Sequence, residues 1–130
     1  MIDHLTLLVR DYARSRDFYL QALAPLGYTM VMELTREQIP VLEFPATCGL
    51  GVNGKPDLWL RPSADGVIAP THIAFRAADR ATVDAFHAAA LAAGATDNGA
   101  PGPRPHYHPG YYGAFVLDPD GYNIEAVCHG

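Results

Sequence analysis

The chain has 130 residues, of which 49% are hydrophobic and 18% are charged, and its formal net charge is −5. Length and composition suit one buried core, so we expect a single soluble domain covering residues 1–130. The acidic balance argues against nucleic acid and anionic membranes as partners, because both are negatively charged.

Targeting and redox features are few. The longest purely apolar run, Ala88 to Ala93, is too short to cross a bilayer, and no signal peptide precedes the first expected strand. Cys48 and Cys128 have neither the number nor the spacing of a disulfide framework or a metal motif. We therefore expect reduced thiols and a cytoplasmic location.

The first half of the chain predicts a strand from about Ile2, then an amphipathic helix with Asp11 as its N-cap. Gly27 lies near the end of that helix. Further strands are expected at Tyr28–Leu34, Val41–Thr47 and Asp57–Leu60, with a hairpin turn at the Asn-Gly pair of "CGLGVNGK". Residues 62–70 are rich in Pro, Gly and Ser and suit a connector.

The second half repeats the first. A shift of 68 residues (72 − 4) places His4 to Ala24 over His72 to Ala92, so that Asp11 meets Asp79. A hairpin follows, with strands Tyr111–Leu117 and Asn123–Val127 joined by the turn "DPDG". We predict an α+β fold of two βαβββ modules, residues 1–61 and 71–130.

The repeat also relates residues that bind metals. His4 and His72 occupy the same place in their modules, and Glu125 lies in an apolar strand, where a carboxylate must find a strong partner or face solvent. Two imidazoles and one carboxylate can hold a divalent cation such as Zn, Ni, Fe, Mn or Co and leave positions open for substrate. The alternative is that these histidines are only hydrogen-bonded residues of the core or of a sheet edge.

Other candidates are less specific. His106 and His108 lie in the loop "PGPRPHYHPGYY", where functional residues are common but polar residues are common as well. Trp59, Tyr111 and Tyr112 are candidate walls of a substrate pocket, or simply packing residues. We expect His87 and His129 to be solvated.

Three segments resemble the vicinal oxygen chelate superfamily of glyoxalase I, bleomycin resistance proteins and extradiol dioxygenases. They are "HLTLLVRDYARSRDFY", "HIAFRAAD" and the most specific, "DPDGYNIEA". The resemblance implies the glyoxalase/bleomycin resistance/dihydroxybiphenyl dioxygenase fold, whose mixed sheets curl around a shared metal cavity. It also implies His4, His72 and Glu125 as ligands, and a homodimer, because modules pair between chains in many members.

Departures from the family patterns separate its branches. Glyoxalase I has a fourth ligand, a carboxylate or amide, in the last strand of module one. The shift of 68 residues matches Glu125 with Asp57 (125 − 68 = 57), whereas an alignment of the hairpin turns points to Leu58 or Trp59, so a fourth ligand stays open. Extradiol dioxygenases have a loop histidine, which His106 or His108 could supply, and a tyrosine where this chain has Phe115. Bleomycin resistance proteins usually lack the ligand set that this chain retains.

The resemblance therefore predicts a metal-dependent lyase or isomerase of the glyoxalase type, acting on a small substrate with vicinal oxygens. Glu125, or an unidentified carboxylate opposite it, would move the proton. The alternatives are a ring-cleaving dioxygenase and a metal-free protein that binds a small molecule.

Overall fold

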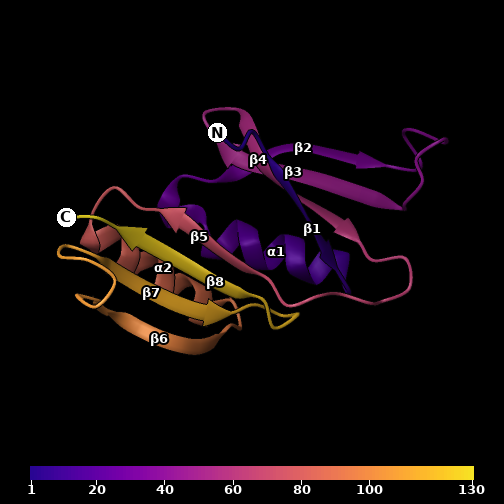
Figure 1. Ribbon diagram of the computed structural model, residues 1–130. Coiled ribbons are helices and arrows are strands. Elements are labelled where there is room, and N and C mark those ends of the chain that lie inside the picture. The colour runs from indigo at the N-terminus through magenta and orange to yellow at the C-terminus, as the bar shows by residue number, and fades with distance from the viewer.

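The computed structural model describes residues 1–130 and contains eight strands, two α-helices and one short 3-10 helix (Figure 1). Both halves follow the order strand, helix, three strands. The first half consists of β1 (Leu5–Val9), α1 (Tyr12–Ala22), η1 (Ala24–Leu26), β2 (Thr29–Thr35), β3 (Ala46–Val52) and β4 (Lys55–Pro62). The second consists of β5 (His72–Arg76), α2 (Arg80–Ala92), β6 (Thr96–Pro103), β7 (Tyr112–Leu117) and β8 (Asn123–Cys128).

Each half forms its own four-stranded mixed sheet. The strand orders are β1-β4-β3-β2 in the first sheet and β5-β8-β7-β6 in the second, so the two topologies are equivalent. In both, the first strand pairs with the last in parallel and the other pairs are antiparallel. The α+β fold with two βαβββ modules, predicted from the repeat, is confirmed.

Each helix packs on its own module and the two helices contact one another. Both begin at the predicted aspartate: Asp11 accepts a hydrogen bond from the backbone N–H of Arg14 at 3.1 Å, and Asp79 accepts one from Thr82 at 2.8 Å. The apolar faces of the helices and of both sheets form one core of 21 buried residues, among them Phe18, Leu60, Phe86 and Ile124. Neither helix has the length and apolar character needed to span a membrane.

One strand prediction is wrong, and one predicted strand had no bounds. The expected strand Val41–Thr47 lies too early: Val41 is 88% exposed, and β3 runs instead from Ala46 to Val52. β3 must run directly into the two-residue turn, where Asn53 and Gly54 have φ of 54° and 74°, because the strands of such a hairpin pair up to the turn itself. The βαβββ pattern of the second module required a strand after its helix but gave no bounds for it, since "TDNGAPGP" lacks a strand signal. The structure places β6 there, and its two prolines are tolerated because it is an edge strand.

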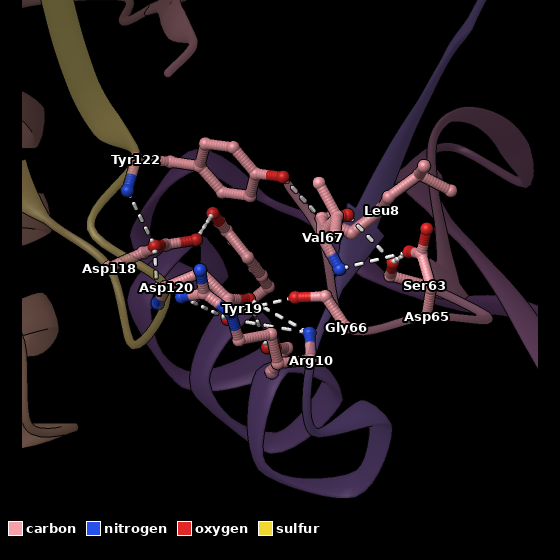
Figure 2. Close-up of polar contacts among 11 residues, drawn as sticks. Leu8, Arg10, Tyr19, Ser63, Asp65, Gly66, Val67, Asp118, Asp120 and Tyr122 are labelled. Carbon is pink, nitrogen blue, oxygen red and sulfur yellow. Dashed lines mark hydrogen bonds and ion pairs between the residues drawn. The ribbon is translucent and has the colours of Figure 1, made fainter. Parts of the chain in front are cut away.

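The turn between β7 and β8 forms hydrogen bonds that join the second module to the first (Figure 2). The buried hydroxyl of Tyr19 on α1 donates to Asp118, and the hydroxyl of Tyr122 donates to the carbonyl of Leu8 at 2.6 Å. The backbone N–H of Arg10 lies 3.3 Å from a carboxylate oxygen of Asp120. These contacts fix how the modules, and hence the candidate site residues, sit relative to one another.

Candidate functional site

Each sheet has one face turned away from its helix, and these faces carry the candidate residues. Alternation along the strands places Leu58 and Leu60 in the core and Trp59 on the opposite face of the first sheet. In the second sheet Ile124 and Ala126 pack in the core, which leaves Glu125 on the opposite face. The candidates therefore form two groups, one on each sheet.

The group on the second sheet is centred on Glu125. Its side chain is only 3% exposed, and its Oε2 lies 2.9 Å from Nε2 of His72, a side chain that is 46% exposed. The hydroxyl of Tyr111 donates to the other carboxylate oxygen. Asn123 Nδ2 lies 2.6 Å from Nδ1 of His72. Burial, and the hydrogen bond to Glu125, raise the pKa of Tyr111, so its phenol keeps its proton.

A glycine makes room for this arrangement. A Cβ atom added to Gly113 on β7 would lie 3.1 Å from Oε1 of Glu125 and 3.2 Å from the ring of Tyr111. The backbone of Gly113 does not require glycine, because its φ is not positive. Space alone therefore favours glycine beside the carboxylate.

The His72–Glu125 pair has the spacing of two ligands of one cation. Ligands bonded at about 2.0–2.2 Å and placed at right angles lie roughly 3 Å apart, close to the 2.9 Å between Nε2 and Oε2. No group of three His, Cys, Asp or Glu side chains in the chain has the geometry to hold a metal ion. One chain thus brings two of the three predicted donors together.

His4 stands apart from that pair. It immediately precedes β1, its side chain is 53% exposed, and its Nδ1 lies 2.6 Å from the carboxylate of Asp3. The hydrogen bond from His4, followed by the contact with Lys55, lowers the pKa of Asp3. With Trp59 and Arg61, His4 lines a shallow hollow of about 240 Å³ on the first sheet.

Asp57 is turned away from this hollow by a β-bulge. Leu50 pairs with Leu58 and Gly51 with Pro56, so one step along β3 spans two residues of β4 and leaves Asp57 as the extra residue. Asp57 lines a different cavity, of about 370 Å³, together with Tyr28. Burial and the Asp57 carboxylate raise the pKa of Tyr28. The bulge separates Asp57 from His4 and Trp59, although the repeat alignment matched Asp57 with Glu125.

The two loop histidines contact the site only through other residues. His108 packs edge-on against the ring of Tyr111, with centroids 5.2 Å apart, and its Nε2 lies 2.7 Å from Nδ1 of the exposed His129. His106 is exposed and packs against Tyr107. Neither histidine hydrogen bonds with Glu125 or His72.

Tyr112 and His87 lie elsewhere. The hydroxyl of Tyr112 donates to Asp84 on α2, so this side chain points away from the Glu125 face. His87 is not solvated as expected: it is mostly covered, and its Nε2 lies 2.9 Å from Asp97. The backbone N–H of Gly99, together with His87, lowers the pKa of Asp97.

Sequence analysis missed three residues around Glu125, namely Gly113, Asn123 and Arg104. Asn123 has a readable signal, since it lies two residues before Glu125 in a strand and so shares its face. Arg104 has none, because its place depends on the path of the loop between β6 and β7. Gly113 has none, because the space beside it depends on where the side chains of Glu125 and Tyr111 lie.

Comparison with known proteins gives a consistent result. The sequence profile of the Glyoxalase/Bleomycin resistance protein/Dioxygenase superfamily matches residues 1–126. A glyoxalase/bleomycin resistance protein from Albidiferax ferrireducens T118 is similar in structure with a TM-score of 0.72 and 26% identity, covering 96% of this chain and 95% of that one. No curated protein matches the chain.

Two further structures share the fold. A glyoxylase/bleomycin resistance protein/dioxygenase domain from Frankia sp. EAN1pec has a TM-score of 0.75 at 18% identity, covering 100% of this chain and 98% of that one. A glyoxalase I mutant from Zea mays has a TM-score of 0.71 at 22% identity, covering 95% of this chain and 45% of that one.

Proposed function

Since the chain belongs to the Glyoxalase/Bleomycin resistance protein/Dioxygenase superfamily, we propose that it is a divalent-metal-dependent lyase or isomerase acting on a small substrate with vicinal oxygens. The observation that carries the proposal is the 2.9 Å separation of His72 Nε2 and Glu125 Oε2. Both side chains lie on the helix-free face of the second sheet, where the His72 side chain is 46% exposed.

The roles of the residues follow from their contacts. His72 and Glu125 would hold the metal, which when bound supplies Lewis-acid polarisation of the substrate oxygens. Tyr111 donates to Glu125 and so holds the carboxylate in one orientation. Glu125 would accept and return the substrate proton on Oε2, because the hydroxyl of Tyr111 occupies Oε1. His108, packed against the ring of Tyr111, would keep that phenol in place.

The third donor would come from a second copy of the chain. His4 and Trp59 lie on the open face of the first sheet, apart from His72 and Glu125. A two-fold dimer that sets the first sheet of one protomer against the second sheet of its partner would form two equivalent sites. Each would combine His4 of one chain with His72 and Glu125 of the other, and Trp59 would form part of the pocket wall.

Metal content tests the ligand assignment. Protein purified without chelator should contain a divalent metal by elemental analysis, and His72→Ala should lower its affinity for that metal by tenfold or more. His87→Ala is the matched control, because His87 also contacts a carboxylate in the second module. Equal metal content in parent and His72→Ala, or no metal in the parent after reconstitution, would refute the assignment.

Mixing two defective variants tests where the third donor lies. His4→Ala and His72→Ala should each bind little metal alone. If each site is shared between chains, half of the dimers in an equal mixture after subunit exchange are mixed, and each has one intact site. About a quarter of the parent's metal content should therefore return. No recovery, with exchange verified by mass-tagged subunits, would place all three donors within one chain.

Ring cleavage of a catechol is the second candidate, favoured by one observation. Phe115 cannot exchange a proton in place of the dioxygenase tyrosine. The hydroxyl of Tyr111, which immediately precedes the strand of Phe115, reaches Glu125 and could take that part. Protein loaded with Fe(II) without oxygen and then exposed to air should take up negligible oxygen with simple catechols if the lyase or isomerase proposal holds. A yellow ring-cleavage product that is lost in Glu125→Ala would favour the dioxygenase instead.

A further inference from the structure

Arg104 follows β6 and lies beside the candidate site. Its guanidinium carbon is 5.5 Å from the centre of the Phe115 ring. Phe115 is the register partner of Glu125, and its ring centre lies 6.0 Å from that of His72. The backbone N–H of Arg104 also donates to the carbonyl of Tyr111 at 2.8 Å. A positive charge is thus built into the Glu125 face through Phe115 and Tyr111.

The guanidinium is held in place by the backbone. Nη1 donates to the carbonyl of Gly102 at 2.9 Å and Nη2 to that of Ala100 at 2.7 Å. Glycines leave space for it: a Cβ atom on Gly102 would lie 3.2 Å from Nη1, and one on Gly99 would lie 3.4 Å from Nη2. Arg104 is therefore positioned before any ligand binds, which lowers the entropy cost of using it.

This charge has no carboxylate partner in the chain. No Asp or Glu oxygen lies within 4.0 Å of Arg104, although the net charge of the protein is −5. A guanidinium has five N–H donors, and a third contact, from Nη1 to the carbonyl of Pro103, measures 3.4 Å. The recorded hydrogen bonds use only the two Nη atoms, so the guanidinium keeps its Nε–H and one Nη2–H as donors for an incoming carboxylate.

We propose that Arg104 is the carboxylate-binding residue of the candidate site and that the substrate is a small organic acid of the 2-hydroxy or 2-oxo acid class. In such an acid the carboxylate adjoins the carbon that carries the other oxygen. Arg104 would bind the carboxylate and Phe115 would pack on the apolar body, while the oxygen on the second carbon faces His72 and Glu125. This inference rests on the proposed function only for the location of the substrate.

Binding without metal tests the inference separately from the proposed function. The probes are mandelate, a 2-hydroxy acid, and methyl mandelate, its neutral ester, titrated by calorimetry into full-length protein kept in EDTA. The parent should bind mandelate about tenfold or more tightly than the ester, because an Arg–carboxylate contact contributes an effect of that size. Arg104→Gln should bind both equally weakly.

The matched control is Arg36→Gln, which removes an exposed arginine that also contacts a backbone carbonyl, and it should keep the preference of the parent. Arg104→Lys keeps the charge without the two-pronged donor and should show an intermediate preference. If Arg104→Gln does not fold, as judged by circular dichroism, Arg104→Lys decides. Three results would overturn the inference, whatever the metal measurements show. They are a parent that does not prefer mandelate over its ester, an unchanged preference in either Arg104 variant, and an equal loss of preference in Arg36→Gln.

Discussion

Removing the hydroxyl of Tyr19 should weaken the junction between the two modules. Tyr19 is fully buried in α1 and donates to Asp118, which is itself buried at the turn between β7 and β8. Tyr19→Phe deletes one oxygen and preserves the ring, so core packing changes little. The other oxygen of Asp118 keeps its hydrogen bonds from the backbone of Asp120 and Tyr122, at 2.8 and 2.9 Å.

The expected cost follows from the charge of the acceptor. A hydrogen bond to a charged group contributes about 1.5–3 kcal/mol, and here its loss leaves a buried carboxylate oxygen without its donor. Unfolding entropy of roughly 2.1 cal/mol/K per residue over 130 residues gives about 0.27 kcal/mol/K. A loss of about 2 kcal/mol should therefore lower the Tm by about 7 °C.

Calorimetry and urea unfolding at neutral pH measure this loss, with Tyr107→Phe as the control because Tyr107 is 57% exposed. Burial raises the pKa of Asp118 and the Tyr19 bond opposes that rise, so the pKa of Asp118 should rise further in Tyr19→Phe. The substitution destabilises the charged form of Asp118, because that form loses its hydrogen bond from Tyr19. The difference in unfolding free energy between the parent and Tyr19→Phe should therefore be largest at neutral pH, where Asp118 is ionised in both the folded and the unfolded chain. It should shrink as the pH falls through the pKa of Asp118 in the folded protein. A Tm shift equal to that of the control, or a difference that grows in acid, would refute this reasoning.

Three further predictions concern single positions. Gly113→Ala should destabilise the fold by about 1–3 kcal/mol in urea unfolding, because its Cβ would lie 3.1 Å from the carboxylate of Glu125. Glu125→Gln should lower the pKa of Tyr111 while leaving it above that of free tyrosine, because burial is the larger cause of its rise; ultraviolet titration against Tyr111→Phe would show this. Gly54→Ala should lower the free energy of unfolding by about 1–2 kcal/mol, because φ at this position is 74° although nothing lies within 4 Å of the added atom. A smaller loss in thermal unfolding would contradict a purely backbone cause.

Much of the fold could be predicted because local signals agreed with the internal repeat. Asp11 and Asp79 are N-caps whose side chains satisfy helix N–H groups, and both were identified from sequence. The turn at Asn53 and Gly54 requires positive φ, which the residue types reveal. The register shift at Asp57 was not predicted, because a bulge depends on how β3 meets β4; the only mark that it leaves in β4 is Pro56, since a proline inside an inner strand is confined to bulges.

The candidate site was predictable only where strands position its residues. Glu125 and His72 lie on neighbouring parallel strands, and their meeting follows from the repeat and from strand alternation. His108 and Arg104 lie on a loop, whose path is set by contacts such as that from Arg104 to Gly102 rather than by a periodic pattern. The separation of His4 from the pair depends on how whole modules are placed, which no local signal encodes.

The junction contacts also affect the order in which a growing chain can reach its final state. Leu8 and Tyr122 are 114 residues apart, and Tyr19 and Asp118 are 99 apart. A chain emerging from the ribosome can pair β1 with β4 once residue 62 is free, but Tyr19 has no acceptor until the β7–β8 turn has been synthesised. Until then the surface of the first module around Tyr19 stays exposed to solvent. A translational pause before residue 118 would prolong its exposure to chaperones and proteases.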